Sequence, residues 1–97
     1  MFNQNFSIMK NLRKKMLHEM ERRNYSSRTI ASYICMVARL SKHYNKSPDR
    51  ISLEQVKSYL HKVIVKGYSV TYLNQTISAI KILYEDVLNR KWEPLGI

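Results

Sequence analysis

Two segments of the chain place small hydroxyl and amide side chains beside cations at helical spacing. The first covers residues 25–33 and the second covers residues 69–81. Each has a Ser suited to capping a helix at or near its start, and each carries one apolar stripe. Ser, Thr, Asn and Gln beside Lys or Arg suit the close approach of a phosphodiester backbone, because all of them bind phosphate oxygens. The two faces therefore indicate a binding site for a polyanion, with DNA as the first candidate.

The composition also indicates a polyanionic partner. The 97 residues include 17 Lys and Arg but only 7 Asp and Glu, which gives a net charge of +10. Such an excess points first to nucleic acid and second to an anionic membrane surface. Hydrophobic residues make up 44% of the chain, so it has enough apolar surface for one modest folded domain.

Four segments with helical apolar periodicity predict an all-α fold of four helices, arranged as two helical hairpins. Only two Gly and two Pro occur, and they fall between or after the helical patterns. The expected helices cover residues 7–23, 26–44, 53–66 and 69–89. The stripes expected to be buried are, in chain order, Met9, Leu12, Met16 and Met20; Ile30, Tyr33, Ile34, Val37 and Leu40; Leu53, Val56, Leu60, Val63 and Ile64; and Leu73, Ile77, Ile80, Tyr84 and Val87.

Local signals mark where these helices begin and end. Ser52 is followed three residues later by Gln55, which predicts a capping box at the start of the third helix. Gly67 follows that helix, where a left-handed residue commonly ends one. Pro48 predicts that residues 45–51 form a loop. Ile82 points away from the last apolar stripe, which either a contact with the first helix or a neighbour missing from this sequence would explain.

The helix faces opposite the apolar stripes supply the candidate DNA contacts. Asn74 and Gln75 lie near the start of the fourth helix, where unpaired backbone N–H groups also favour phosphate. Either amide has the geometry to hydrogen-bond an adenine edge. The candidate DNA-binding residues are Arg28, Thr29, Ser32, Arg39, Lys42, Thr71, Asn74, Gln75, Ser78 and Lys81.

Other chemistries have little support in the sequence. Cys35 is the only cysteine, which rules out an intrachain disulfide and is typical of a reducing cytoplasm. His18, His43 and His61 lack metal-ligand spacing, so we expect no metal and no cofactor. No apolar run is long enough to span a membrane, and the first six residues do not resemble a secretion signal.

The order and spacing of the motifs resemble the N-terminal core-binding, SAM-like domain of tyrosine recombinases, the phage-integrase family. In the family's first motif, Tyr-Ser-x-x-Thr-Ile-x-x-Tyr followed by an apolar position, the matching residues are Tyr25, Ser26, Thr29, Ile30, Tyr33 and Val37. Its second motif is matched or nearly matched by Ser69, Leu73, Asn74, Ile77, Ser78, Ala79, Ile80 and Lys81. Residues 51–60 are similar to a third family segment. Tyr72 stands where the family usually has Thr, while Gln75 and Lys81 stand where it usually has Arg.

The resemblance implies a DNA-binding domain over residues 1–92, with residues 93–97 beginning a linker to a catalytic domain that this sequence lacks. It implies that the second and fourth helices face the major groove and its flanking backbone of double-stranded DNA. In the family a C-terminal domain carries the chemistry, through a Tyr nucleophile and cationic and His side chains around the scissile phosphate. No such constellation can be identified among the seven Tyr of this chain, so we expect it to bind DNA without being an enzyme.

We further expect a monomer in isolation that assembles with other protomers on DNA, in the cytoplasm of a prokaryote or from a mobile element. Two alternatives remain open at this point. Small helical bundles also serve as protein-interaction modules, and the first helix is basic and amphipathic enough for a peripheral membrane binder.

Overall fold

The chain folds into four α-helices that form two hairpins. The computed structural model describes residues 2–90, with side chains for residues 11–90. Its elements are α1 (Phe2–Arg22), α2 (Ser27–Tyr44), the short 3₁₀ turn η1 (Pro48–Arg50), α3 (Leu53–Val65), α4 (Val70–Lys81) and the π-helical segment η2 (Ile82–Val87). The described residues contain no strand, and the predicted all-α fold is confirmed. The first helix begins at Phe2 rather than at residue 7, since nothing in residues 2–6 breaks a helix.

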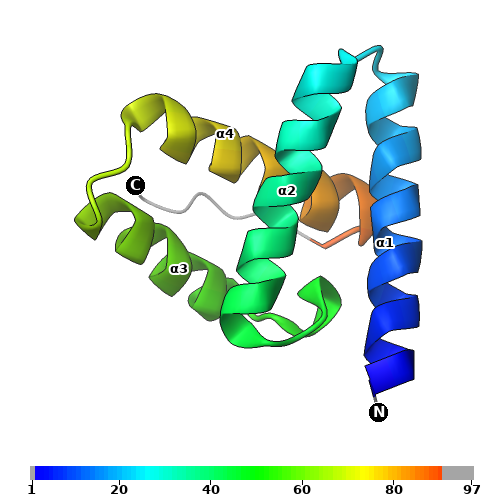
Figure 1. Ribbon diagram of the computed structural model, residues 1–97, viewed down its shortest axis with the longest axis horizontal. Helices are drawn as coiled ribbons and strands as arrows, with labels where there is room; N and C mark the ends of the chain where they lie inside the picture. Colours follow the sequence, from blue (N-terminus) through cyan, green and yellow to red (C-terminus); the bar gives the residue numbers. More distant parts are fainter. Residues whose placement is uncertain (1, 91–97) are drawn as a thin grey trace.

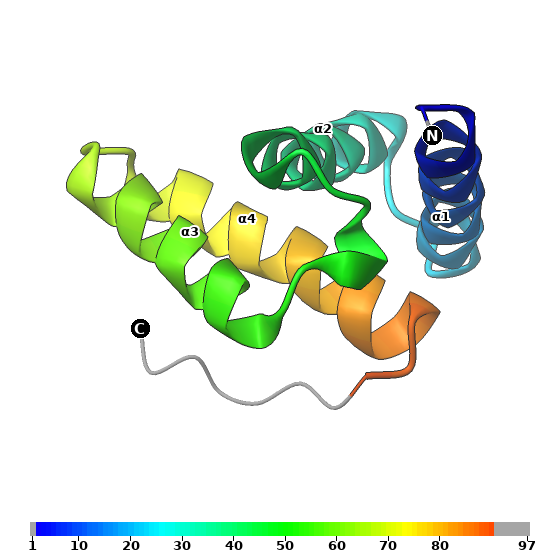
Figure 2. The ribbon, with the colours of Figure 1, turned by 90° about the horizontal axis from the view of Figure 1, so that it is seen from below.

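The two hairpins cross each other and are joined through α4. Helices α1 and α2 run antiparallel side by side, and α3 and α4 form the second pair (Figure 1). Helix α4 packs against both α2 and α3, and its continuation η2 packs against α1. The turn η1 lies between the two hairpins and connects α2 to α3 (Figure 2). The core therefore lies where α4 and η2 meet the first hairpin.

The predicted helix caps are present in the structure. The Ser26 hydroxyl accepts the backbone N–H of Thr29 at 3.2 Å, and the Ser69 hydroxyl accepts that of Tyr72 at 3.1 Å. Ser52 and Gln55 form the predicted capping box. Gly67 follows α3 with φ +84°, a left-handed conformation that glycine adopts without steric cost. These local signals fix where α2, α3 and α4 begin.

The buried core contains many residues of the predicted apolar stripes, with one correction. Leu12, Met16, Met20, Val37, Leu40, Val56, Leu60, Val63, Ile80 and Tyr84 are buried as predicted. Ile30, Tyr33, Ile34, Leu53, Leu73, Ile77 and Val87 are half-buried, and the side chain of Met9 lies outside the described residues. The prediction that Ile64 is buried was wrong, because Ile64 is 43% exposed. Tyr59 of the same helix is buried, although it was not part of the predicted stripe. Helix α3 packs mainly against α4, so the face that α3 buries is narrower than the apolar stripe predicted for it from the sequence.

The last helix changes form at Ile82, which the sequence pattern did not predict. From there the backbone widens into a π-helix, with the N–H of Leu88 bonded to the carbonyl of Leu83 at 2.9 Å. Ile82, Leu83 and Tyr84 are consecutive and all at most 4% exposed. Successive side chains point in different directions around a helix, so three buried ones in a row require neighbouring elements on more than one side of the helix. Helix α1 packs against this segment, which accounts for the burial of Ile82.

Two tyrosine hydroxyls form hydrogen bonds with backbone carbonyls at the connection between α2 and α3 and at the start of α3. Tyr84 donates a hydrogen bond to the carbonyl of Pro48 at 2.8 Å, and Tyr44 donates one to the carbonyl of Gln55 at 2.7 Å. Burial raises the pKa of Tyr84, so its hydroxyl stays protonated as a donor at neutral pH. The side chain of Arg90 also donates to the carbonyls of Asp49 and Ile51. The path of the chain from α2 to α3 is thus fixed by side chains from distant residues.

We predict that Ile80→Ala destabilises the domain by about 2–5 kcal/mol, because Ile80 is fully buried where α4 meets the core. Urea unfolding followed by circular dichroism measures this loss. The matched control is Ser78→Ala, an exposed position on the same helix, which should change stability by less than about 0.5 kcal/mol. Equal unfolding midpoints for the two variants would show that the core is not centred on α4.

Candidate nucleic-acid interface

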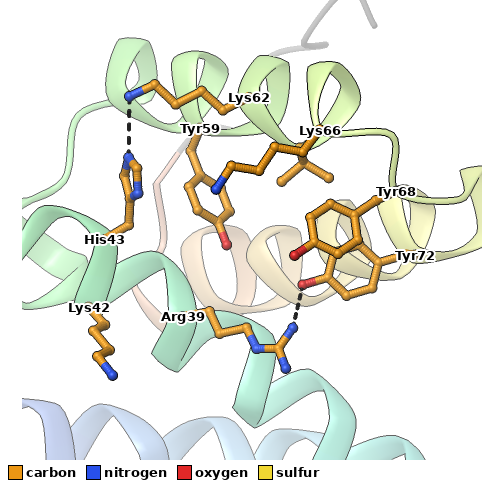
Figure 3. A pocket seen from close by; sticks show the side chains of 9 residues that line it. Arg39, Lys42, His43, Tyr59, Lys62, Lys66, Tyr68 and Tyr72 are labelled. Atoms are coloured by element: carbon orange, nitrogen blue, oxygen red, sulfur yellow. Dashed lines mark hydrogen bonds between the residues drawn. The ribbon is translucent and has the colours of Figure 1, made fainter.

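A concave pocket opens where the C-terminal halves of α2 and α3 meet the start of α4. Its volume is about 370 Å³. Four cations, one histidine and three tyrosines account for all but one of its lining residues. The full set is Arg39, Lys42, His43, Tyr59, Lys62, Val63, Lys66, Tyr68 and Tyr72 (Figure 3). Cations from two helices therefore meet aromatic rings from two helices and the turn between them.

Arg39 is held in place by a tyrosine from the second hairpin. Its Nη1 donates a hydrogen bond to the Tyr72 hydroxyl oxygen at 2.9 Å (Figure 3). This bond is the main reason that the pKa of Arg39 lies above its ordinary value. Arg has five N–H donors in a rigid fork, so one bond to Tyr72 leaves others to bind an anion. The residue is exposed despite this contact.

A second contact links α2 to α3 across the pocket. The Lys62 Nζ lies 3.4 Å from the His43 Nε2, and a neutral imidazole nitrogen accepts a hydrogen bond from an ammonium group. The His43 ring packs edge-on against Tyr44 and Tyr59, with centroid distances of 4.7 and 5.2 Å. Burial raises the pKa of Tyr59, so its hydroxyl is neutral at physiological pH. The pocket wall is thus ordered by ring contacts and hydrogen bonds.

The pocket concentrates positive charge without a compensating carboxylate. No Asp or Glu is among its lining residues in the described part of the chain. Lys62 in the last turn of α3 and Lys66 at the C-cap of that helix are four residues apart, a spacing at which like charges disfavour the helix by about 0.2–0.5 kcal/mol. An anion bound among these cations relieves their mutual repulsion. The arrangement is therefore suited to binding phosphate.

The cations at the C-terminal end of α1 are arranged in the opposite way. Arg22 contacts the Glu19 carboxylate at 2.6 Å, and the hydrogen bond from Arg22 lowers the pKa of Glu19. Arg23 contacts Glu19 at 2.9 Å and Asp86 of η2 at 2.5 Å. These two arginines are paired within the protein, so they are poorer phosphate ligands than the pocket cations.

The structure brings together only part of the residue set predicted from the sequence. Arg39 and Lys42 line the pocket, whereas Arg28 is exposed roughly three turns earlier on α2. Thr29 and Ser32 are half-buried, and the Thr29 hydroxyl accepts a hydrogen bond from Ser26 at 2.9 Å. The α4 candidates are all exposed outside the pocket lining, namely Thr71, Asn74, Gln75, Ser78 and Lys81.

Sequence reasoning missed the contribution of α3. Tyr59 and Lys62 of α3 and the C-cap residue Lys66 follow one another at spacings of three and four residues, which places them on one side of the helix and its end. That spacing was a usable signal, but only the packing of α3 beside α4 shows that the cations face Arg39. Tyr68, in the turn before α4, and Tyr72, near the start of α4, also line the pocket.

Neither a metal-binding cluster nor a membrane-spanning helix is found among the described residues. No three His, Cys, Asp or Glu side chains among them are grouped closely enough to hold a metal ion. None of the helices in this part of the chain combines the length and apolarity that crossing a bilayer requires.

Comparison with known proteins agrees with this architecture. The model of the phage integrase N-terminal SAM-like domain matches residues 12–94. The chain belongs to this family. A Sinorhizobium fredii protein provisionally named integrase/recombinase y4qK is 28% identical over 91 residues, covering 93% of this chain. The chain spans about 30% of the length of that relative. No solved structure matches the chain significantly.

For this SAM-like domain, we predict that Arg39→Ala weakens binding to duplex DNA by about three- to fivefold, the effect of losing one partly exposed charge contact. Fluorescence anisotropy with a labelled duplex measures the change. Arg22→Ala removes the same charge from a residue already paired with Glu19, so its effect should be smaller. Equal losses in both variants would mean that net charge alone governs binding.

Proposed function

We propose that this chain is the DNA-binding domain of a site-specific recombinase or integrase. In this role it grips one side of the recombination-site duplex through α2 and α4 and supports DNA integration and recombination by the full-length protein. The observation that carries the proposal is the pocket at the junction of α2, α3 and α4, where four cations gather without a carboxylate. Membership in the integrase family supplies independent support.

The polar faces of α2 and α4 extend this contact along the DNA backbone. Arg28 and Lys81 are exposed cations on those helices, and Asn74 and Gln75 are exposed amides near the start of α4. Phosphate contacts position a protein on DNA, while amide side chains are able to read a base edge. Alanine at Arg28 or Lys81 would remove one phosphate contact each.

The proposal includes partners beyond DNA. The family relative is about three times as long as the region it shares with this chain, which supports a catalytic domain in the full-length protein. Residues 93–97, outside the described part of the chain, would begin the linker to that domain. The isolated domain is monomeric in this proposal, and protomers assemble on DNA in the cytoplasm of a prokaryotic host.

The structure supports the two alternative functions less well. A membrane-binding α1 needs an exposed apolar face, but Leu12, Met16 and Met20 are at most 8% exposed within the core. A protein-interaction role is favoured by one observation, the exposure of Ile64, Val65 and Val70 beside the turn between α3 and α4. That surface lies beside the cationic pocket and does not account for the pocket's charge.

We predict a steep salt dependence of binding to duplex DNA. About four to six phosphate contacts should give a slope of log K against log salt near −4 to −5, since each contact contributes about 0.9. Affinity should be about micromolar, as for largely non-specific contact. Titrations at several salt concentrations measure the slope. A slope shallower than about −2 would favour the protein-interaction alternative, and binding to anionic liposomes instead of DNA would favour the membrane alternative.

We also predict that the isolated chain forms no covalent bond to DNA. The proposal assigns the nucleophilic Tyr to the catalytic domain of the full-length protein. Within this chain, burial raises the pKa of Tyr59 and Tyr84, which keeps both hydroxyls protonated. Incubation with nicked suicide substrates, followed by a denaturing gel, tests this. A protein–DNA adduct from the fragment alone would require an activated tyrosine nucleophile and would contradict the assignment.

A further inference from the structure

The pocket differs from a flat DNA-binding face in its shape and its aromatic content. A volume of about 370 Å³ falls within the usual range of about 300–1,000 Å³ for small-ligand sites. A duplex backbone needs only an open groove or face of cations and polar groups. Three tyrosines in a concave, cationic site indicate a ligand that carries both a phosphate and an aromatic ring.

Tyr68 is the side chain best placed to receive such a ring. It stacks on Tyr72, with ring centroids 4.5 Å apart and planes 22° from parallel (Figure 3). Its residue is 49% exposed, so much of the ring remains accessible. Tyr72 is itself hydrogen-bonded to Arg39, which places a guanidinium at the edge of the stacked pair. A base stacked on Tyr68 would therefore have a cation close to its phosphate.

A base within a duplex cannot use this arrangement. Its faces are covered by neighbouring base pairs, and only its edges are accessible in the grooves. An unpaired nucleotide exposes a ring face, and stacking of one base on an aromatic side chain strengthens binding by about fivefold or more. The pocket is large enough for one nucleotide and provides cations on two sides of it, from α2 and from α3.

We propose that the pocket formed by Arg39, Lys62, Lys66, Tyr68 and Tyr72 is a site for a single unpaired nucleotide of a DNA strand. The base stacks on Tyr68, while Arg39 and the two lysines bind its phosphates. This inference rests on the proposed DNA-binding function and adds to it a preference for DNA with an unpaired base. No bond is made or broken at the site.

The test compares the affinity of the full chain for three duplexes of the same sequence. The first is fully paired, the second carries one extra unpaired adenine, and the third carries an abasic residue at that position. The abasic duplex has the flexibility of a bulge without the base. We expect the adenine bulge to bind at least about fivefold more tightly than either of the other two, from the lower end of the stacking contribution.

Variants at one exposed position separate stacking from other effects. Tyr68→Ala should bind all three duplexes about equally, whereas Tyr68→Phe keeps the ring and should retain the preference. Arg28→Ala, outside the pocket, should weaken all three alike. Circular dichroism melting checks that each variant is folded.

The outcomes distinguish this inference from the function on which it rests. Normal binding to paired DNA, with no preference for the adenine bulge in the wild type or an unchanged preference in Tyr68→Ala, would overturn the inference alone. A lack of binding to any duplex would overturn both. A free deoxynucleoside monophosphate that bound as tightly as the bulged duplex would show a site for free nucleotides and would also overturn the proposal.

Discussion

The packing of α4 against α2 is the contact on which the other features of this domain depend. The helices belong to different hairpins, so their contact joins the two halves of the fold. Leu40 of α2 and Ile80 of α4 are both 0% exposed in the shared core, and η2, which continues α4, packs against α1. The same crossing places Tyr72 within hydrogen-bonding distance of Arg39. The core and the candidate interface are therefore products of one packing arrangement.

Charge is distributed unevenly over this scaffold. Glu19 and Asp86 pair with arginines where α1 meets η2, and the described lining of the pocket contains no acidic residue. The domain thus has a side where cations are neutralised internally and a side where they are available to an anion. An uneven distribution of this kind orients a basic protein on a polyanion, because field strength follows local rather than net charge.

Much of the fold could be predicted from the sequence because its signals are local. Serine caps, the capping box at Ser52 and the apolar stripes act within one helix, and the structure contains them. The exposure of Ile64 and the burial of Ile82 do not follow from local signals, because they depend on which helices pack against α3 and η2. The pocket shows the same limit. The sequence predicted that the cations of α2 lie on one face of that helix. It did not predict that they lie beside the cations of α3, because that depends on how the two hairpins pack.

The central claim is that DNA contacts the junction of α2, α3 and α4 rather than the paired cations of α1. Amide NMR spectra recorded during titration with duplex DNA test it most directly, because each residue reports separately. The account predicts the largest shifts around Arg39, Lys62 and Tyr68, with small shifts at Arg22 and Arg23. Shifts concentrated on α1, with the pocket residues unchanged, would contradict it.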